Sequence, residues 1–214
     1  MIKSQIPNLK SHIAVAEEFP LMEHYYTIQG EGFNTGAPAY FLRLGGCDVG
    51  CVWCDVKDSW DLKKQPRVHI DDMIEIVRQA NASTVVITGG EPLMHDLNYL
   101  ADRFHQNKTR VWLETSGAYP LSGTWDWICV SPKKFKSPLK SVLEKANELK
   151  VVIFNSSDFD WAGRNSLMVN SECKLFLQPE YSRRAEIIPL IIDYIKQNPE
   201  WRISLQTHKY MNIP

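Results

Sequence analysis

The sequence predicts an α/β fold, an open or partial (β/α) barrel with roughly six parallel strands. Short β-rich segments alternate with helical patterns through most of the 214 residues, as in βα units around a parallel sheet. Several of these segments are apolar throughout, which is typical of strands buried on both faces. Polar motifs follow the ends of the segments, and in such folds the loops after the strands build the binding site.

The strand candidates are short segments rich in β-branched and aromatic residues. They are 38–44 (PAYFLRL), 84–88 (TVVIT), 110–114 (RVWLE), 126–131 (DWICVS), 149–154 (LKVVIF), 173–178 (CKLFLQ) and 202–206 (RISLQ). The cysteine-rich loop follows the first of them, and the TGGEP, ETSG and SPK motifs follow the next three.

Two amphipathic helices are predicted between the strands. The segment 71–80 (DDMIEIVRQA) places Met73, Ile74 and Val77 on one face. The segment 183–198 (RRAEIIPLIIDYIKQN) does the same with Ile187, Leu190, Ile191, Tyr194 and Ile195. Pro189 lacks the N–H group that a helix interior needs, so it is expected to mark the true start of this helix or a kink.

No linker, repeat or low-complexity tract divides the chain, which predicts one catalytic domain at 21–214 after an N-terminal extension at 1–20. The formal charge is −1, with 24 basic and 25 acidic residues interspersed, so a small-molecule partner is expected rather than nucleic acid. No apolar stretch reaches the roughly eighteen residues of a membrane span. We therefore expect a cytoplasmic protein, in which the five cysteines stay thiols or bind metal, with Cys129 and Cys173 in the core.

Cys47, Cys51 and Cys54 lie within the eight residues CDVGCVWC. Three thiolates on one short loop can hold three irons of a cubane cluster, and no fourth cysteine at matching spacing is present for the last iron. That iron would stay open to a ligand. The alternatives are a zinc site completed by His24 or His69, and a disulfide with one thiol left over.

The TGGEP loop combines Thr88, the side-chain-free Gly89 and Gly90, the carboxylate of Glu91 and a proline suited to a first helical turn. Such a loop exposes backbone to a ligand, and a ligand with both an ammonium and a carboxylate group suits it. The alternative is an ordinary turn between a strand and a helix, with the glutamate on the helix dipole.

Together, these two motifs resemble those of radical S-adenosylmethionine (SAM) enzymes, which carry CxxxCxxC and GGEP-like loops. The resemblance implies a barrel of the radical SAM type and a [4Fe-4S] cluster whose open iron is chelated by SAM. It implies that one electron cleaves SAM to methionine and a 5′-deoxyadenosyl radical, which abstracts hydrogen from the substrate. A strongly reducing cluster requires an external donor such as a flavodoxin.

Further segments are similar to those of the 7-carboxy-7-deazaguanine synthase family, from about Tyr26 to the last residue. They are YTIQGEGFNTGAPAYFLRLGGC at 26–47, VVITGGEP at 85–92, ETSG at 114–117, VSPK at 130–133, LQPE at 177–180 and LQTHKYMNIP at 205–214. This similarity implies contraction of 6-carboxy-5,6,7,8-tetrahydropterin to 7-carboxy-7-deazaguanine with loss of ammonia, a step of the queuosine pathway. It also implies a homodimer.

The family pattern assigns site residues to matching positions of this sequence. Those implied for the pterin are Ile28, Gln29, Gly30, Arg43, Thr88, His208 and the terminal Pro214. Those implied for SAM are Gly89, Gly90, Glu91, Ser116, Ser131, Pro132, Lys133 and Gln178. The chemistry is consistent, because acceptors such as Gln29 can read the N–H donors of a pterin edge, and Arg43 offers a planar cation to the pterin carboxylate.

One position departs from the family pattern. After the third cysteine the family has Asp followed by Thr or Ser, whose hydroxyl ligates Mg²⁺, whereas this chain has Asp55 and Val56. Valine cannot ligate magnesium, so we expect a Mg²⁺ site built from substrate and water with help from Asp55 or Asp58, or a weakened dependence on the metal.

Two other functions are compatible with parts of the sequence. A glycyl-radical enzyme activase has the same cysteine spacing but acts on a protein, for which QGEG and QTHKYMNIP have no evident use. A non-enzymatic iron-sulfur or zinc protein would need neither TGGEP nor VSPK, because a carrier binds no SAM.

Overall fold

The computed structural model describes residues 17–214. Most of the predicted extension at 1–20 lies outside these residues. Strand β1 (Glu18–Ile28) begins before the predicted boundary, and Phe19 within it is buried in the core. The part of the extension that the structure describes therefore belongs to the main sheet, where it pairs with the edge strand β3.

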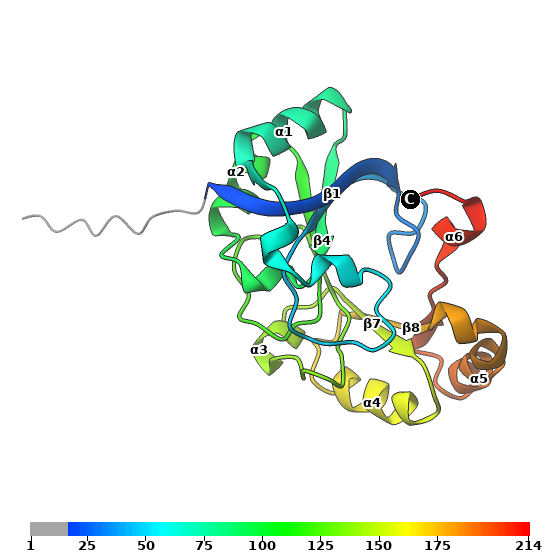
Figure 1. Cartoon of the computed structure of the whole chain (residues 1–214). Helices are drawn as coiled ribbons and strands as arrows, with labels where there is room; N and C mark the ends of the chain where they lie inside the picture. The colour runs from blue at the N-terminus through cyan, green and yellow to red at the C-terminus, as the bar shows by residue number, and fades with distance from the viewer. Residues whose placement is uncertain (1–16) are drawn as a thin grey trace, which may run out of the picture.

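Within residues 17–214 the strands form one sheet of nine, in the order β3-β1-β2-β4-β5-β6-β7-β8-β9. The parallel strands are β2 (Pro38–Leu44), β4 (Thr84–Gly89), β5 (Arg110–Thr115), β6 (Trp127–Val130), β7 (Glu148–Ile153), β8 (Lys174–Pro179) and β9 (Trp201–Ile203). Because β3 (Arg67–His69) and β9 stand at opposite ends of this order, the sheet does not close, and the predicted partial barrel is confirmed (Figure 1).

The strand prediction is corrected in two respects. All seven predicted segments overlap a parallel strand, one more than the roughly six parallel strands expected. The last of these strands covers 201–203 where 202–206 was predicted. Strands β1 and β3, which pair antiparallel at the edge, were missed. The sequence of β1, EFPLMEHYYTI, mixes buried and exposed residues without strict alternation and contains a proline, so it lacks the periodicity of a strand.

The six helices of the described residues follow the strands along the chain. They are α1 (Ile70–Gln79), α2 (Asn98–Gln106), α3 (Lys140–Leu143), α4 (Ser157–Ser166), α5 (Arg184–Gln197) and α6 (Thr207–Met211). Met73, Ile74 and Val77 of α1 are buried as predicted. Helix α5 continues through Pro189, so the proline does not mark its start, and Leu190 of its predicted apolar face is 43% exposed.

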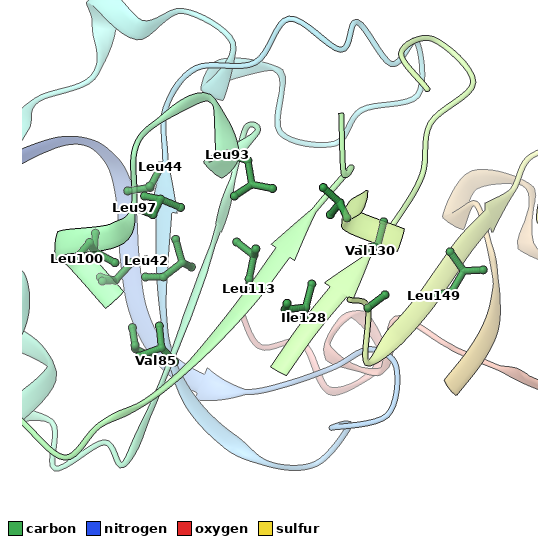
Figure 2. Packing of buried hydrophobic residues seen from close by; sticks show 14 of the residues in the cluster. Leu42, Leu44, Val85, Leu93, Leu97, Leu100, Leu113, Ile128, Val130 and Leu149 are labelled. Atoms are coloured by element: carbon green, nitrogen blue, oxygen red, sulfur yellow. The ribbon is translucent and has the colours of Figure 1, made fainter. Parts of the chain in front are cut away.

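The alternation of side chains along each parallel strand separates the core from the site. One set, which includes Leu42, Val85, Leu113 and Leu149, packs into the core under the helices (Figure 2). The residues between them point to the other face of the sheet. Toward the carboxyl ends of the strands that second set is polar, with Thr88, Glu114, Ser131, Lys150 and Gln178 lining one cleft.

Two further predictions concern the burial of Cys129 and Cys173 and the presence of membrane-spanning segments. Cys129 and Cys173 are both buried, as predicted for core residues. Across residues 17–214, none of the helices is long and apolar enough to span a bilayer.

Candidate active site

The cleft lies at the carboxyl ends of the parallel strands and encloses about 1120 Å³, including its open mouth. It is lined by the cysteine loop, the TGGEP loop, the ETSG and SPK motifs and the segment after β8.

The cysteine loop follows β2 and lines the cleft with all three thiols. Cys51 is buried, whereas Cys47 and Cys54 are partly exposed. Burial raises the pKa of the Cys47 and Cys51 thiols, so a bound metal is needed to hold them as thiolates. Asp48 fixes the loop from outside, because its carboxylate accepts hydrogen bonds from Tyr119 at 2.6 Å and from Lys136 at 2.8 Å.

The TGGEP loop packs directly on the cysteine loop. The Gly90 N–H donates to the Leu44 carbonyl and the Glu91 N–H to the Gly46 carbonyl, both at 2.8 Å. A Cβ at Gly89, where φ is +118°, would lie 2.3 Å from the Leu44 oxygen, and one at Gly90 would lie 2.2 Å from the Gly46 oxygen. The two glycines are thus required for the contact between the loops, in addition to any exposure of backbone to a ligand.

The carboxylate of Glu91 is buried and holds the TGGEP loop to the end of β5. Its Oε1 accepts from the Thr115 hydroxyl at 2.5 Å and the Leu93 N–H at 3.0 Å. Its Oε2 accepts from the Ser116 N–H at 2.7 Å and from the Ser116 hydroxyl. Both oxygens are therefore occupied by protein donors, and the Ser116 hydroxyl proton is directed at Glu91 and not at the cleft.

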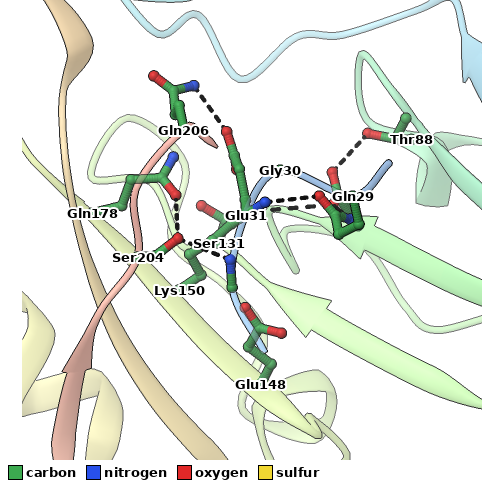
Figure 3. Close-up of polar contacts among 12 residues, drawn as sticks. Gln29, Gly30, Glu31, Thr88, Ser131, Glu148, Lys150, Gln178, Ser204 and Gln206 are labelled. Carbon is green, nitrogen blue, oxygen red and sulfur yellow. Dashed lines mark hydrogen bonds and ion pairs between the residues drawn. The ribbon is translucent and has the colours of Figure 1, made fainter. Parts of the chain in front are cut away.

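At the β1 side of the cleft, Gln29 and Thr88 are connected through Glu114. The Gln29 amide donates to Glu114 Oε1 at 2.9 Å, and the Thr88 hydroxyl donates to Glu114 Oε2 at 3.1 Å (Figure 3). Gly30 lies against His208, since a Cβ there would be 2.3 Å from the His208 Nδ1. The contacts with Gln29 and Thr88 hold the acceptor oxygens of Glu114 along one wall of the cleft.

A buried ion pair crosses the floor of the cleft. Lys150 Nζ lies 2.5 Å from Glu31 Oε2 and 4.0 Å from Glu114 Oε1. Burial disfavours the charge on Lys150, but the attraction of Glu31 together with Glu114 and Glu148 outweighs burial and raises the Lys150 pKa well above its usual value. Burial likewise opposes the charge on Glu31, but the attraction and hydrogen bond of Lys150, together with hydrogen bonds from Gln178 and from Gln206 at 2.8 Å, lower the Glu31 pKa. Lys150 and Glu31 on the floor of the cleft therefore both stay charged, as a pair, at neutral pH.

On the opposite side, Lys133 and Gln178 line the cleft near the cysteine loop. Lys133 Nζ donates to the carbonyl and hydroxyl of Ser131, at 2.8 and 2.5 Å, and lies 5.4 Å from the centroid of the Trp53 ring. Burial lowers the Lys133 pKa. Gln178 Oε1 accepts from the Ser204 hydroxyl at 2.7 Å, and the Gln178 amide faces Glu31 and helps to lower the Glu31 pKa.

Arg43 lines the cleft at the end of β2. Its Nε donates to the Tyr25 hydroxyl at 2.7 Å and lies 3.0 Å from the Glu23 carboxylate. These contacts occupy only one of the five N–H donors of the guanidinium group, so the fork retains donors for a carboxylate in the cleft.

The cysteine residues fit an iron-sulfur cluster better than a single metal ion. Nowhere in residues 17–214 do three or more His, Cys, Asp and Glu side chains converge to hold one metal ion. A structural zinc would need four such ligands. His24 is paired with Tyr40 and His69 caps α1, and neither lines the cleft. Three separate thiols around one cleft instead suit a cluster that takes one cysteine for each of three irons.

Comparison with known proteins agrees with this geometry. The radical SAM superfamily pattern matches residues 42–151. A 7-carboxy-7-deazaguanine synthase of Flavobacterium psychrophilum is 52% identical over 198 residues, which cover 92% of this chain and 94% of the relative. The synthases of Synechocystis sp. and Escherichia coli are 45% and 36% identical over 91% and 92% of this chain and over 93% and 99% of their own.

This chain belongs to the 7-carboxy-7-deazaguanine synthase family of radical SAM enzymes. The crystal structure of QueE from Escherichia coli superposes with a TM-score of 0.79 at 32% identity, covering 88% of this chain and 93% of that one. The resemblance drawn from the CxxxCxxC and GGEP motifs is thereby confirmed.

Most residues that the family pattern assigns line this one cleft. They are Arg43, Cys47, Cys51, Cys54, Thr88, Gly89, Gly90, Glu91, Ser116, Ser131, Lys133 and Gln178. Gln29 is buried directly behind the wall through its bond to Glu114. Ile28, Gly30, Pro132, His208 and Pro214 lie outside the lining. Pro214 is exposed, and its carbonyl oxygen accepts from the Thr27 hydroxyl at 3.4 Å.

Several residues of the cleft were missed in the family assignment. They are Glu31, Glu114, Lys150, Gln206 and Lys209. A signal existed for Lys150, because a single charge inside the apolar segment LKVVIF is unusual for a buried strand. No local signal existed for Glu31 or Gln206, whose roles depend on contacts between residues far apart in the chain.

Below the ion pair, Glu148 is a buried carboxyl group with an unpaired oxygen. Its Oε2 accepts from the Trp127 indole at 3.1 Å and the Phe33 N–H at 3.2 Å, while Oε1 has no partner among the described residues. Burial raises the Glu148 pKa by more than the nearby Lys150 lowers it. Folding therefore shifts the Glu148 carboxyl toward its neutral form.

We expect Glu91→Gln to lower the free energy of unfolding by about 2–3 kcal/mol, because the new amide cannot accept from all four donors and a buried N–H loses its partner. Urea denaturation of the purified variant measures this loss. Glu144→Gln, an exposed position on the same protein, is the matched control and should change stability by less than about 0.5 kcal/mol. Equal effects of the two substitutions would show that the Glu91 contacts are not an anchor.

Glu148→Gln should stabilise the protein more at pH 8 than at pH 5. A carboxyl whose pKa is raised on folding contributes stability below its unfolded pKa, and that contribution is lost as the pH rises through its folded pKa. Because glutamine does not titrate, the variant does not lose this stability as the pH rises. Urea denaturation at both pH values, with the exposed Glu172→Gln as control, measures the difference. A stability difference from wild type that is independent of pH would contradict a raised Glu148 pKa.

Proposed function

We propose that the chain converts 6-carboxy-5,6,7,8-tetrahydropterin to 7-carboxy-7-deazaguanine with release of ammonia. The observation that carries this proposal is the meeting of three elements in one cleft: the cysteine loop, the TGGEP loop and a wall of paired acceptors. The first two suit a cluster and SAM, and the third suits a flat, donor-rich ring. The relatives that cover nine-tenths of the chain carry the name of this synthase.

For the cofactors, we assign Cys47, Cys51 and Cys54 to the [4Fe-4S] cluster and the residues around Gly90 to SAM. When bound, the cluster supplies one electron, and SAM supplies the radical that abstracts hydrogen. The methionine end of SAM fits the backbone of Gly89 and Gly90 next to the cysteine loop. Glu91 and Ser116 shape this subsite through their mutual hydrogen bonds. Ser131, Pro132, Lys133 and Gln178 form the side suited to the nucleoside.

For the pterin, we assign recognition of the amino-pyrimidinone edge to the backbone of Ile28 and Gly30 and to Gln29, Thr88 and Glu114. Glu114 is held in place by Gln29 and Thr88, so its orientation is set before the substrate binds. Arg43 faces the substrate carboxylate. His208 and Pro214 approach from the C-terminal segment, where burial lowers the His208 pKa and favours a neutral imidazole.

Magnesium fits this chain poorly. Val56 lines the cleft after the third cysteine and offers no oxygen ligand. Asp55 is 63% exposed in its side chain and is paired with Lys209, and the residues of 17–214 do not gather into a cage of three acidic ligands. Mg²⁺ prefers octahedral oxygen coordination, which substrate and water would have to supply almost alone.

The proposals for the reductant, the oligomeric state and the cellular location rest on the chemistry of the chain. A low-potential cluster needs an external reductant, for which a flavodoxin-like protein is our proposal. Tyr26 and Ile28 of β1 are exposed apolar side chains, and we propose that a homodimer covers them. Free thiols in a near-neutral protein suit a cytoplasmic enzyme without nucleic-acid partners, with residues 21–214 as the catalytic domain.

The alternative of a glycyl-radical enzyme activase is not favoured. The floor of the cleft is filled by the Lys150–Glu31 pair, and helix α6 is joined to β1 through Thr207 and Gly30. A polypeptide substrate has no use for such a set of buried polar groups, whereas a small polar ring does.

Mass spectrometry of an anaerobic reaction tests the proposal, with reconstituted protein, dithionite, SAM, magnesium and the pterin. We expect a product lighter than the pterin by ammonia, and its formation should fall by at least about a thousandfold in Cys51→Ala because the cluster loses a ligand. Cys173→Ala, a buried cysteine outside the cleft, is the control and should retain the activity. Formation of 5′-deoxyadenosine without the lighter product would reject the pterin as substrate.

A further inference from the structure

Four cationic side chains line the cleft, and three of them are closely held. Lys150 is 2.5 Å from Glu31, Lys133 donates to the Ser131 carbonyl at 2.8 Å, and Arg43 is 3.0 Å from Glu23. Lys209 differs from them. Its Nζ lies 3.4 Å from Asp55 Oδ2, a longer contact than the others, and the Asp55 side chain is 63% exposed. Lys133 has no carboxylate partner among the described residues but is held by two contacts to Ser131, so Lys209 is the cleft cation whose carboxylate contact is longest and most exposed.

The ammonium group of Lys209 is nevertheless held in a defined place. Lys209 Nζ donates to the side-chain Oε1 of Gln206 at 3.0 Å and lies 4.4 Å from the centroid of the Tyr181 ring. Helix α6 is fixed in turn, because Thr207 donates both its N–H and its hydroxyl to the Gly30 carbonyl at 2.9 Å. Lys209 is therefore presented to the cleft by a segment that is anchored to the substrate wall.

The partner of Lys209 belongs to the segment in which Mg²⁺ would be expected. Asp55 stands between Cys54 and Val56, and all three line the cleft together with Lys209. Val56 removes the metal-ligating hydroxyl from that segment. A substrate carboxylate entering there meets an ammonium group and no preformed metal site.

We propose that Lys209 binds the carboxylate of the substrate, together with Arg43, and supplies the positive charge that a metal ion would otherwise supply. This inference rests on the proposed function. The exchange of partners is favourable, because an exposed ion pair such as Lys209–Asp55 contributes only about 0–1 kcal/mol. A charge-assisted hydrogen bond to a desolvated carboxylate is stronger than such a pair.

Isothermal titration calorimetry tests this role separately from turnover. The reconstituted protein with SAM, in buffer without added divalent metal, is titrated with 7-carboxy-7-deazaguanine and with 7-deazaguanine, which lacks the carboxylate. In Lys209→Gln we expect affinity for the carboxylated ligand to fall about tenfold to thirtyfold, with unchanged affinity for 7-deazaguanine. Lys209→Arg should retain most of the affinity. Lys64→Gln, a lysine outside the cleft with an exposed partner, should have no effect.

Magnesium provides the second arm of the experiment. Added Mg²⁺ should leave the affinity of wild type nearly unchanged, whereas in the double variant Val56→Thr/Lys209→Gln it should restore binding of the carboxylated ligand. Equal losses for both ligands in Lys209→Gln, or a large effect of Mg²⁺ on wild type, would overturn the inference.

The proposed function and the role of Lys209 can be rejected separately. If wild type forms the ring-contracted product while Lys209→Gln binds both ligands as wild type does, only the role of Lys209 is rejected. If wild type binds neither ligand and forms no product, the proposed function fails and this inference with it.

Discussion

The parallel pairing of β2 with β4 is the constraint on which the rest of the site depends. Its register sets Arg43 opposite Thr88 and Leu44 opposite Gly89, so the cysteine loop and the TGGEP loop leave the sheet side by side. The Gly90 and Glu91 N–H groups then close the gap by donating to carbonyls of the cysteine loop. The Glu91 carboxylate extends this junction to β5. One local arrangement therefore positions both the thiols and the backbone suited to the ligand of an open iron.

The inward face of the sheet supplies the second half of the site, at an energetic cost. Buried charges are expensive to desolvate, and the Lys150–Glu31 pair is tolerated because it is short and each partner has further polar contacts. Such a pair contributes little to net stability but fixes the orientation of its neighbours. Gln206 connects it to the C-terminal segment, which brings α6 near the end of β1, as Figure 1 shows. The proposed substrate site is thus built from segments at both ends of the described chain.

The parts of this account that the sequence could predict are those with local signals. The parallel strands have uniform apolar composition, α1 has a clear helical period, and the cysteine and TGGEP motifs are contiguous. Strand β1 could not be predicted in the same way, because its stability comes from pairing with β2 and not from its own pattern. The contacts of Glu91 with Thr115 and of Glu31 with Lys150 join residues 24 or more positions apart, so no window of sequence shows them. Glu91 was expected to meet the ligand, yet its oxygens bind protein donors.

The proposed chemistry requires that the three thiols leave one iron of a [4Fe-4S] cluster open for SAM within this cleft. Electron paramagnetic resonance of the reduced, reconstituted protein, with and without SAM labelled with ¹⁵N at its amino group, tests it most directly. We expect SAM to change the cluster spectrum, and we expect electron–nuclear double resonance to detect coupling to the labelled nitrogen. A cluster whose spectrum is unaffected by SAM, or a protein that assembles no cluster with all three cysteines present, would contradict it.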